Sequence, residues 1–202
     1  KIISEYKDKF PKIISVYNIP FEEWPGGTKA YGYSVAKGDY ITSCDADDFM
    51  HYKAVELYVE AAYKGDYDII ISPINEIDKE NDTVKVTGKI QLNQETAILN
   101  ASRNLPAKLI KREFYLSHDP IQSGFTYDDA AYHLSVLPYA RIGYCPTPVY
   151  YYIRYKESVS GDLKKSLFCI YSFDYVLEHL PSVYTETVFC ACILQFYYFI
   201  KA

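Results

Sequence analysis

The sequence predicts an α/β fold in which helices flank a mostly parallel β-sheet. Helix-like and strand-like segments alternate over residues 1–73, which is typical of a parallel sheet with right-handed crossovers. The 202 residues, of which 49% are hydrophobic and 23% charged, are sufficient for one sizeable core. This composition also excludes a disordered chain.

Local patterns define the elements of the first part. Residues 53–65 have the i, i+3, i+4, i+7 apolar spacing of an amphipathic helix, which Gly65 closes. Short β-branched runs predict the strands between the helices. The expected order is a helix ending near residue 10, a strand at 12–17, a helix at 28–37, a strand at 39–44, a helix at 53–65 and a strand at 68–73.

The rest of the chain is less regular. Its last apolar stretch, residues 188–200, is too short to span a bilayer and is expected to form a buried or interfacial helix. The expected elements are a strand or hairpin at 83–92, a short helix at 95–101, a strand leading into a helix at 107–116, a helix at 127–137, strands at 141–145 and 149–155, and two final helices broken at Pro181.

Charge and cysteine content narrow the class of protein. The net charge of −5 argues against nucleic acid as the main ligand. The five cysteines form no C-x-x-C pair, which predicts reduced thiols rather than a zinc site or a disulfide framework. Reduced thiols are typical of a cytoplasmic protein, which we expect here, and the sequence shows no basic-then-apolar segment of a signal peptide.

Three carboxylates directly follow the predicted strand at 39–44: Asp45, Asp47 and Asp48. In a parallel sheet, ligands bind beyond the carboxyl ends of the strands. Carboxylates that converge there favour Mg²⁺ or Mn²⁺, with open positions for the phosphates of a nucleotide diphosphate. The alternative interpretation is a solvated turn that caps the next helix.

Two other motifs also place carboxylates at a similar spacing. An EF-hand requires an oxygen ligand and then a glycine where this chain has Phe49 and Met50. A phosphohydrolase of the haloacid dehalogenase type, with Asp45 as its nucleophile, expects Thr or Val at the position of Phe49. This second alternative stays open at the level of the motif.

The stretch GGTKAYGYSVAKGDYITSCDADDF resembles the donor-site segment of inverting family 2 glycosyltransferases with the GT-A fold. The resemblance implies that Asp45 lies near the nucleoside and that Asp47 and Asp48 hold the metal that bridges the diphosphate. The matching residues are Gly27, Lys29, Gly32, Ala36, Gly38, Tyr40, Ile41, Asp45, Asp47 and Asp48.

A second stretch, residues 106–160, resembles the acceptor half of the same family. The resemblance implies that Asp129 is the catalytic base and that Arg154 and Lys156 close over the diphosphate. Asp129 also fits an ordinary helix N-terminal acid, and the two cations also fit a surface pair. The matching residues are Lys108, Leu109, Arg112, Asp128, Asp129, Tyr150, Tyr152, Arg154, Ser158 and Ser160.

The chain departs from the family pattern at three positions. Ala30 stands where the family has Asn, Lys29 where it has Arg, and Asp128 where it has Glu. The resemblance further implies a Rossmann-like GT-A domain at 1–160, without the first strands of its sheet, and a helical extension at 161–202.

The resemblance implies metal-dependent transfer, with inversion, from a nucleotide-diphospho-sugar to a hydroxyl acceptor. A UDP-sugar donor and a saccharide or lipid-linked acceptor in surface polysaccharide or glycolipid synthesis are expected. No Q-x-x-R-W motif is present, which favours single or limited transfer. The final helix is expected to contact the inner face of a membrane or a second copy of the chain. A non-catalytic relative that binds a nucleotide or a partner is a further alternative.

Overall fold

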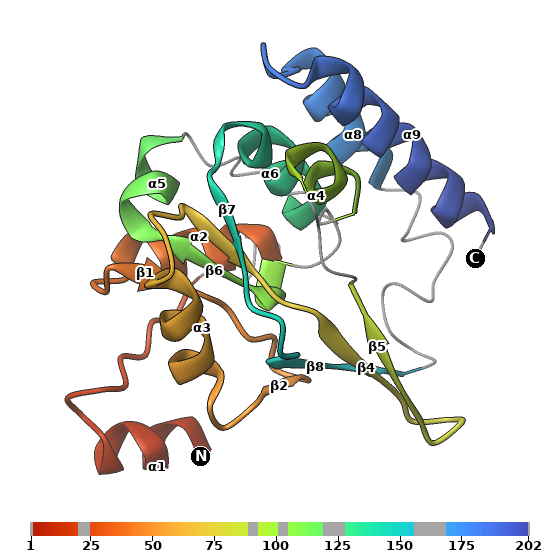
Figure 1. Ribbon diagram of the computed structural model, residues 1–202. Helices are drawn as coiled ribbons and strands as arrows, with labels where there is room; N and C mark the ends of the chain where they lie inside the picture. Colours follow the sequence, from red (N-terminus) through yellow and green to blue (C-terminus); the bar gives the residue numbers. More distant parts are fainter. Residues whose placement is uncertain are drawn as a thin grey trace.

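The computed structural model describes residues 2–19, 25–88, 93–100, 105–118, 128–155 and 169–201. Within these ranges, the strands form two four-stranded sheets flanked by helices (Figure 1). The helices are α1 (Ile2–Lys9), α2 (Pro25–Val35), α3 (Ala54–Ala62), α4 (Gln94–Asn100), α5 (Arg112–Ser117), α6 (Asp128–Val136), α8 (Cys169–Glu178) and α9 (Thr185–Lys201), with 3-10 turns η2 (Leu105–Ala107) and η3 (Leu137–Tyr139). The strands are β1 (Tyr40–Ile41), β2 (Phe49–Met50), β3 (Ile69–Ile71), β4 (Ile74–Asp78), β5 (Thr83–Thr87), β6 (Lys108–Lys111), β7 (Ile142–Tyr144) and β8 (Tyr150–Arg154).

The first sheet has the strand order β1-β6-β3-β7. Strand β6 runs antiparallel to both β1 and β3, whereas β3 and β7 are parallel. Strands β1, β3 and β7 therefore point the same way, and their carboxyl ends lie along one edge of the sheet.

The second sheet has the order β2-β8-β4-β5. Strands β4 and β5 form an antiparallel hairpin, and β8 runs parallel to β4 and antiparallel to β2. The register between β2 and β8 places Phe49 opposite Tyr151 and Met50 opposite Tyr150. Strand β8 therefore lies beside the chain that emerges from the aspartate cluster.

Both faces of the first sheet are covered. Ile69 and Ile71 belong to a larger core cluster that also contains residues of α6, α8 and α9, while Ile70 faces a smaller cluster with Tyr58 of α3. This alternation follows from the two-residue period of a strand, and burial on both faces explains why β3 consists of isoleucines. Helices α8 and α9 pack on α6 and α4, as Figure 1 also shows. The division at residue 160 remains a prediction.

The α/β class is confirmed, but the expected mostly parallel pairing needs correction. Among the described strands, only the pairs β3–β7 and β4–β8 are parallel. The reason is that β6, from much later in the sequence, inserts antiparallel between β1 and β3. Local patterns predict the strands but not their neighbours.

The predictions of helices from local patterns are more accurate than the predictions of strands. All the expected helices in the described ranges are present, but the strand expected at 12–17 is wrong, because residues 11–13 form a turn and no regular structure follows. Ile13 is 83% exposed there, so its β propensity finds no partner strand. Strand β4 was missed because its sequence INEID is largely polar.

The structure has no described helix with the length and apolar character to cross a bilayer.

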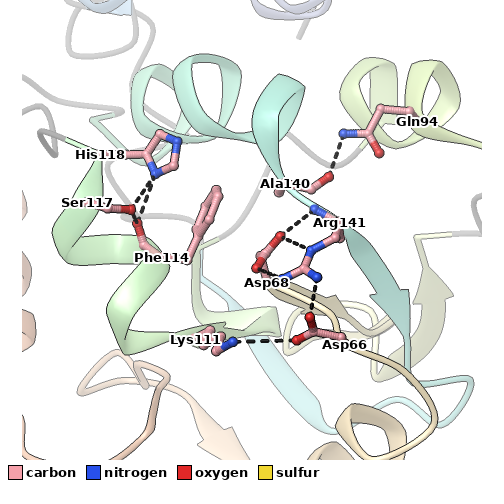
Figure 2. A network of polar contacts seen from close by, with 9 residues as sticks. All are labelled: Asp66, Asp68, Gln94, Lys111, Phe114, Ser117, His118, Ala140 and Arg141. Atoms are coloured by element: carbon pink, nitrogen blue, oxygen red, sulfur yellow. Dashed lines mark hydrogen bonds and ion pairs between the residues drawn. The ribbon is translucent and has the colours of Figure 1, made fainter.

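An ion-pair network closes the edge of the first sheet at which β3 and β7 begin (Figure 2). Asp68 accepts hydrogen bonds from the Arg141 backbone N–H and Nε, both at 2.9 Å, and pairs with Nη2 at 2.7 Å. Asp66 pairs with Arg141 Nη1 and, at 3.5 Å, with Lys111 Nζ. The guanidinium of Arg141 holds the pKa of both carboxyls below their ordinary value.

Candidate functional site

The three aspartates predicted as a site lie in the loop between β1 and β2. This loop, residues 42–48, leaves the first sheet at the carboxyl end of β1 and enters the second sheet at β2. The Asp48 backbone N–H donates to the Asp45 carbonyl oxygen over 3.1 Å, which closes a turn around Asp47. We call residues 45–48 the acidic loop.

Helix α2 brings a cation to the acidic loop. Lys29 Nζ lies 2.8 Å from Asp45 Oδ1, and both side chains are partly exposed. The structure thus joins two of the residues predicted for the donor site. The backbone of Gly27 lies in the first turn of α2, two residues before Lys29, and its surroundings lie outside what the structure describes.

Strand β8 holds the other end of the acidic loop. The Tyr150 hydroxyl donates to Asp48 Oδ2 over 2.6 Å, and the Ile153 backbone N–H donates to Asp48 Oδ1 over 2.8 Å. The same hydroxyl accepts a hydrogen bond of 3.1 Å from the Asp45 backbone N–H. Asp48 therefore ties the loop to a strand of the second sheet through both of its carboxylate oxygens.

The charges of the acidic loop are only partly compensated. Burial raises the pKa of Asp48 above its ordinary value, the hydrogen bonds from Tyr150 and Ile153 oppose this shift, and the neighbouring Asp47 and Asp45 add to it. Burial also raises the pKa of the adjacent Cys44 thiol, and the three carboxylates add to that shift. The local field thus disfavours further negative charge and favours a cation.

Asp47 has the surroundings expected of an open cation ligand. Its side chain is exposed, and in the part of the chain that the structure describes it makes no hydrogen bond or ion pair. The described residues contain no group of three or more His, Cys, Asp or Glu arranged to hold a metal. Mg²⁺ is commonly bound through only one or two carboxylates together with substrate phosphates, so the cation at the acidic loop stays a prediction.

Of the two cations predicted to close over the diphosphate, Arg154 and Lys156, the structure describes only Arg154. Arg154, at the end of β8, pairs with Glu76 of β4 at 2.8 Å and is mostly exposed. Lys156 lies outside the described residues. The backbones of Asp128 and Asp129 form the start of α6 as predicted, but their side chains are also outside the described part.

The structure buries two polar side chains, Tyr150 and His133, to which the sequence assigned no specific role. Tyr150 matched a family motif, but its role as the hydrogen-bonding partner of the acidic loop had no local signal. His133 of α6 is fully buried, and its two ring nitrogens make no hydrogen bond. Burial lowers the pKa of His133, and the charges of Lys108 and Lys29 lower it further. The imidazole is therefore neutral and belongs to the core, as expected for a scattered histidine.

A sequence model of the glycosyl transferase family 2 matches residues 1–133. The chain belongs to glycosyl transferase family 2. The match covers the acidic loop, helix α2 and the start of α6. It agrees with the family proposed from the two sequence motifs, and it includes the whole of the first motif and the second as far as residue 133.

The fold of this family 2 chain is similar to solved structures of TarS from S. aureus. Residues 1–349 of TarS align with a TM-score of 0.56 and 13% identity, covering 86% of this chain and 52% of that one. The same region in complex with UDP-GlcNAc gives a TM-score of 0.58 and 12% identity, covering 86% and 54%. The TarS structure with 14% identity gives 0.59, covering 92% and 36%.

These likenesses confirm the GT-A-like α/β fold. The chain spans about half the length of the TarS 1–349 structures. A search of curated protein sequences found no match.

Proposed function

We propose that this chain is the donor-binding part of a glycosyltransferase that moves a sugar from a nucleotide-diphospho-sugar to a hydroxyl acceptor. The observation that carries the proposal is the acidic loop at the carboxyl end of β1, with Asp45 paired to Lys29 and Asp47 exposed. Family membership supports the reaction class. The likeness to TarS bound to UDP-GlcNAc supports a UDP-sugar as the donor.

The residues of the acidic loop take separate roles in this proposal. Asp45, Lys29 and the Gly27 backbone lie on the nucleoside side of the donor. Asp47 and Asp48 hold Mn²⁺ or Mg²⁺, which supplies positive charge against the leaving diphosphate. Because Asp47 is exposed and without a protein partner among the described residues, its oxygens are available for this contact.

The basic residues after β8 complete the donor site in the proposal. Arg154 and Lys156 donate charge-assisted hydrogen bonds to the diphosphate. To do so, Arg154 must leave its ion pair with Glu76 and bind the diphosphate of the donor instead. That exchange is easy, because the Arg154 side chain is 60% exposed and exposed ion pairs are weak.

Asp129 acts as the base in a direct displacement. Its carboxylate takes the proton of the acceptor hydroxyl as the acceptor oxygen attacks the anomeric carbon. The bond from that carbon to the diphosphate oxygen breaks, and the nucleoside diphosphate leaves, so the configuration inverts. The position of Asp129 in the first turn of α6 supports an ionised carboxylate, since the positive end of a helix favours it.

The proposed acceptor is a saccharide or a lipid-linked saccharide in surface polysaccharide or glycolipid synthesis. Helix α9 exposes Phe189, Ile193 and Leu194. These apolar side chains support a peripheral contact of the protein, either with the inner face of a membrane or with a second copy.

Two substitutions test the division of roles. Asp47→Asn is expected to abolish Mn²⁺-dependent binding of UDP, measured by calorimetry, because it removes a charged ligand. Asp129→Asn is expected to leave that binding unchanged and to lower sugar transfer by at least about 100-fold, the usual contribution of a general base. Normal UDP binding by Asp47→Asn would disprove the cation assignment.

The same assays separate the alternatives. A phosphohydrolase releases phosphate from simple esters and loses that activity in Asp45→Asn, and the family match disfavours it. A non-catalytic relative binds UDP with Mn²⁺ but transfers no sugar from any donor tested.

A further inference from the structure

The hydroxyl of Tyr150 connects the two ends of the acidic loop. It accepts from the Asp45 backbone N–H at 3.1 Å and donates to Asp48 Oδ2 at 2.6 Å. One side chain of β8 thus uses both its acceptor and its donor capacity on residues that flank Asp47.

Tyr150 is buried and lies on an inner strand of the second sheet. Its side chain has no exposed surface, and β8 pairs with β2 on one side and β4 on the other. Just before β2, the carboxylate of Asp48 also accepts the Ile153 N–H, so the loop contacts β8 at a second residue, three positions beyond Tyr150. The second sheet therefore anchors Tyr150, and its hydroxyl reaches from there to the acidic loop.

We propose that Tyr150 is a positioning residue that holds Asp47 and Asp48 in the arrangement that binds a divalent cation together with a nucleoside diphosphate. This inference rests on the proposed function. Hydrogen bonds from a surrounding group fix the orientation of carboxylate ligands, and losing such a bond typically lowers metal affinity about 10- to 100-fold. Each oxygen of Asp48 accepts one hydrogen bond and keeps a lone pair for a cation.

The chain offers a matched control on the same strand. Tyr151 stacks on Phe49 with 4.5 Å between ring centroids, and within the described residues its hydroxyl makes no hydrogen bond. Tyr150→Phe and Tyr151→Phe each remove one hydroxyl from neighbouring positions. Only the first removes a contact with the acidic loop.

The experiment measures Mn²⁺ binding in the presence of UDP, by electron paramagnetic resonance of free Mn²⁺, with circular dichroism as a check of folding. Tyr150→Phe is expected to raise the Mn²⁺ Kd by about 10-fold or more. Tyr151→Phe is expected to leave it unchanged. Equal Kd values for Tyr150→Phe and the unmodified chain would overturn the inference and leave the proposed function standing, whereas no Mn²⁺ binding by the unmodified chain would overturn both.

A double-mutant cycle tests whether Tyr150 acts through Asp48. If it does, Tyr150→Phe adds little to the loss of Mn²⁺ affinity already caused by Asp48→Asn. Full additivity of the two losses would contradict this route. Should Tyr150→Phe not fold, Tyr150→4-aminophenylalanine retains a donor for Asp48 and a weaker acceptor for Asp45. It is expected to weaken Mn²⁺ binding measurably, and an unchanged Kd would overturn the inference.

Discussion

Two groups of aspartates lie at opposite edges of the first sheet, and their surroundings differ. Asp66 and Asp68 precede β3 and share the guanidinium of Arg141, which forms ion pairs with both (Figure 2). Asp45, Asp47 and Asp48 follow β1 and have one described cation beside them, Lys29, which pairs with Asp45. The first group is neutralised within the protein, and the second retains negative charge.

The pKa shifts of the two groups have opposite signs. Hydrogen bonds from Arg141 lower the pKa of Asp68, whereas burial and neighbouring carboxylates raise the pKa of Asp48 despite its two hydrogen bonds. A carboxylate that stabilises the fold, such as Asp68, is paired with a cation of the protein itself. A carboxylate that stays uncompensated at the ligand-binding edge of a sheet is a candidate for binding a ligand from solution.

The largest effects are expected from one substitution in each group, one that lowers stability and one that abolishes UDP binding. Asp68→Asn removes charge-assisted hydrogen bonds to Arg141 and is expected to lower the free energy of unfolding by about 1–3 kcal/mol. It should leave Mn²⁺-dependent UDP binding intact. Asp47→Asn should do the reverse, and urea unfolding with calorimetry on both variants checks the pair. A loss of UDP binding in Asp68→Asn would show that the two edges are not independent.

The two groups should also differ in the order in which Asp48 and Asp68 are protonated as pH falls. Because its pKa is lowered, Asp68 contributes stability that is present above the pKa of the unfolded state and is lost as pH falls through the folded-state pKa. Because its pKa is raised, Asp48 contributes stability that is fully present below the unfolded-state pKa and is lost as pH rises through the folded-state pKa. Carboxyl ¹³C NMR should show Asp48 protonating before Asp68 on acidification. Mg²⁺ with UDP should lower the pKa of Asp48 and leave that of Asp68 unchanged, and an equal shift of Asp68 would contradict a localised cation.

The smallest effect is expected at the exposed member of the network. Asp66 contacts Arg141 and Lys111 from a side chain that is 71% exposed. Because exposed ion pairs contribute little, Asp66→Asn should leave the urea midpoint and UDP binding unchanged. A destabilisation as large as that of Asp68→Asn would mean that Arg141 needs both carboxylates to hold β3 and β7 together.

Local sequence patterns predicted most helices and the position of the acidic loop. Apolar periodicity identified α3, and the change from strand to carboxylates located the acidic loop at the carboxyl end of β1. The same reasoning failed for residues 12–17, where β-branched residues have no partner strand, and for β4, whose polar sequence depends on pairing with β5 and β8. Strand formation depends on neighbours that local propensity does not encode.

The sequence by itself determined the family, the α/β class, and the three carboxylates next to a cation-bearing helix. The tertiary structure decided which of those carboxylates is exposed and which is held. Asp48 is separated from Tyr150 by 102 positions and from Ile153 by 105. Their contact depends on the register of β2 against β8, and strand register is fixed by packing across the whole domain rather than by any local pattern.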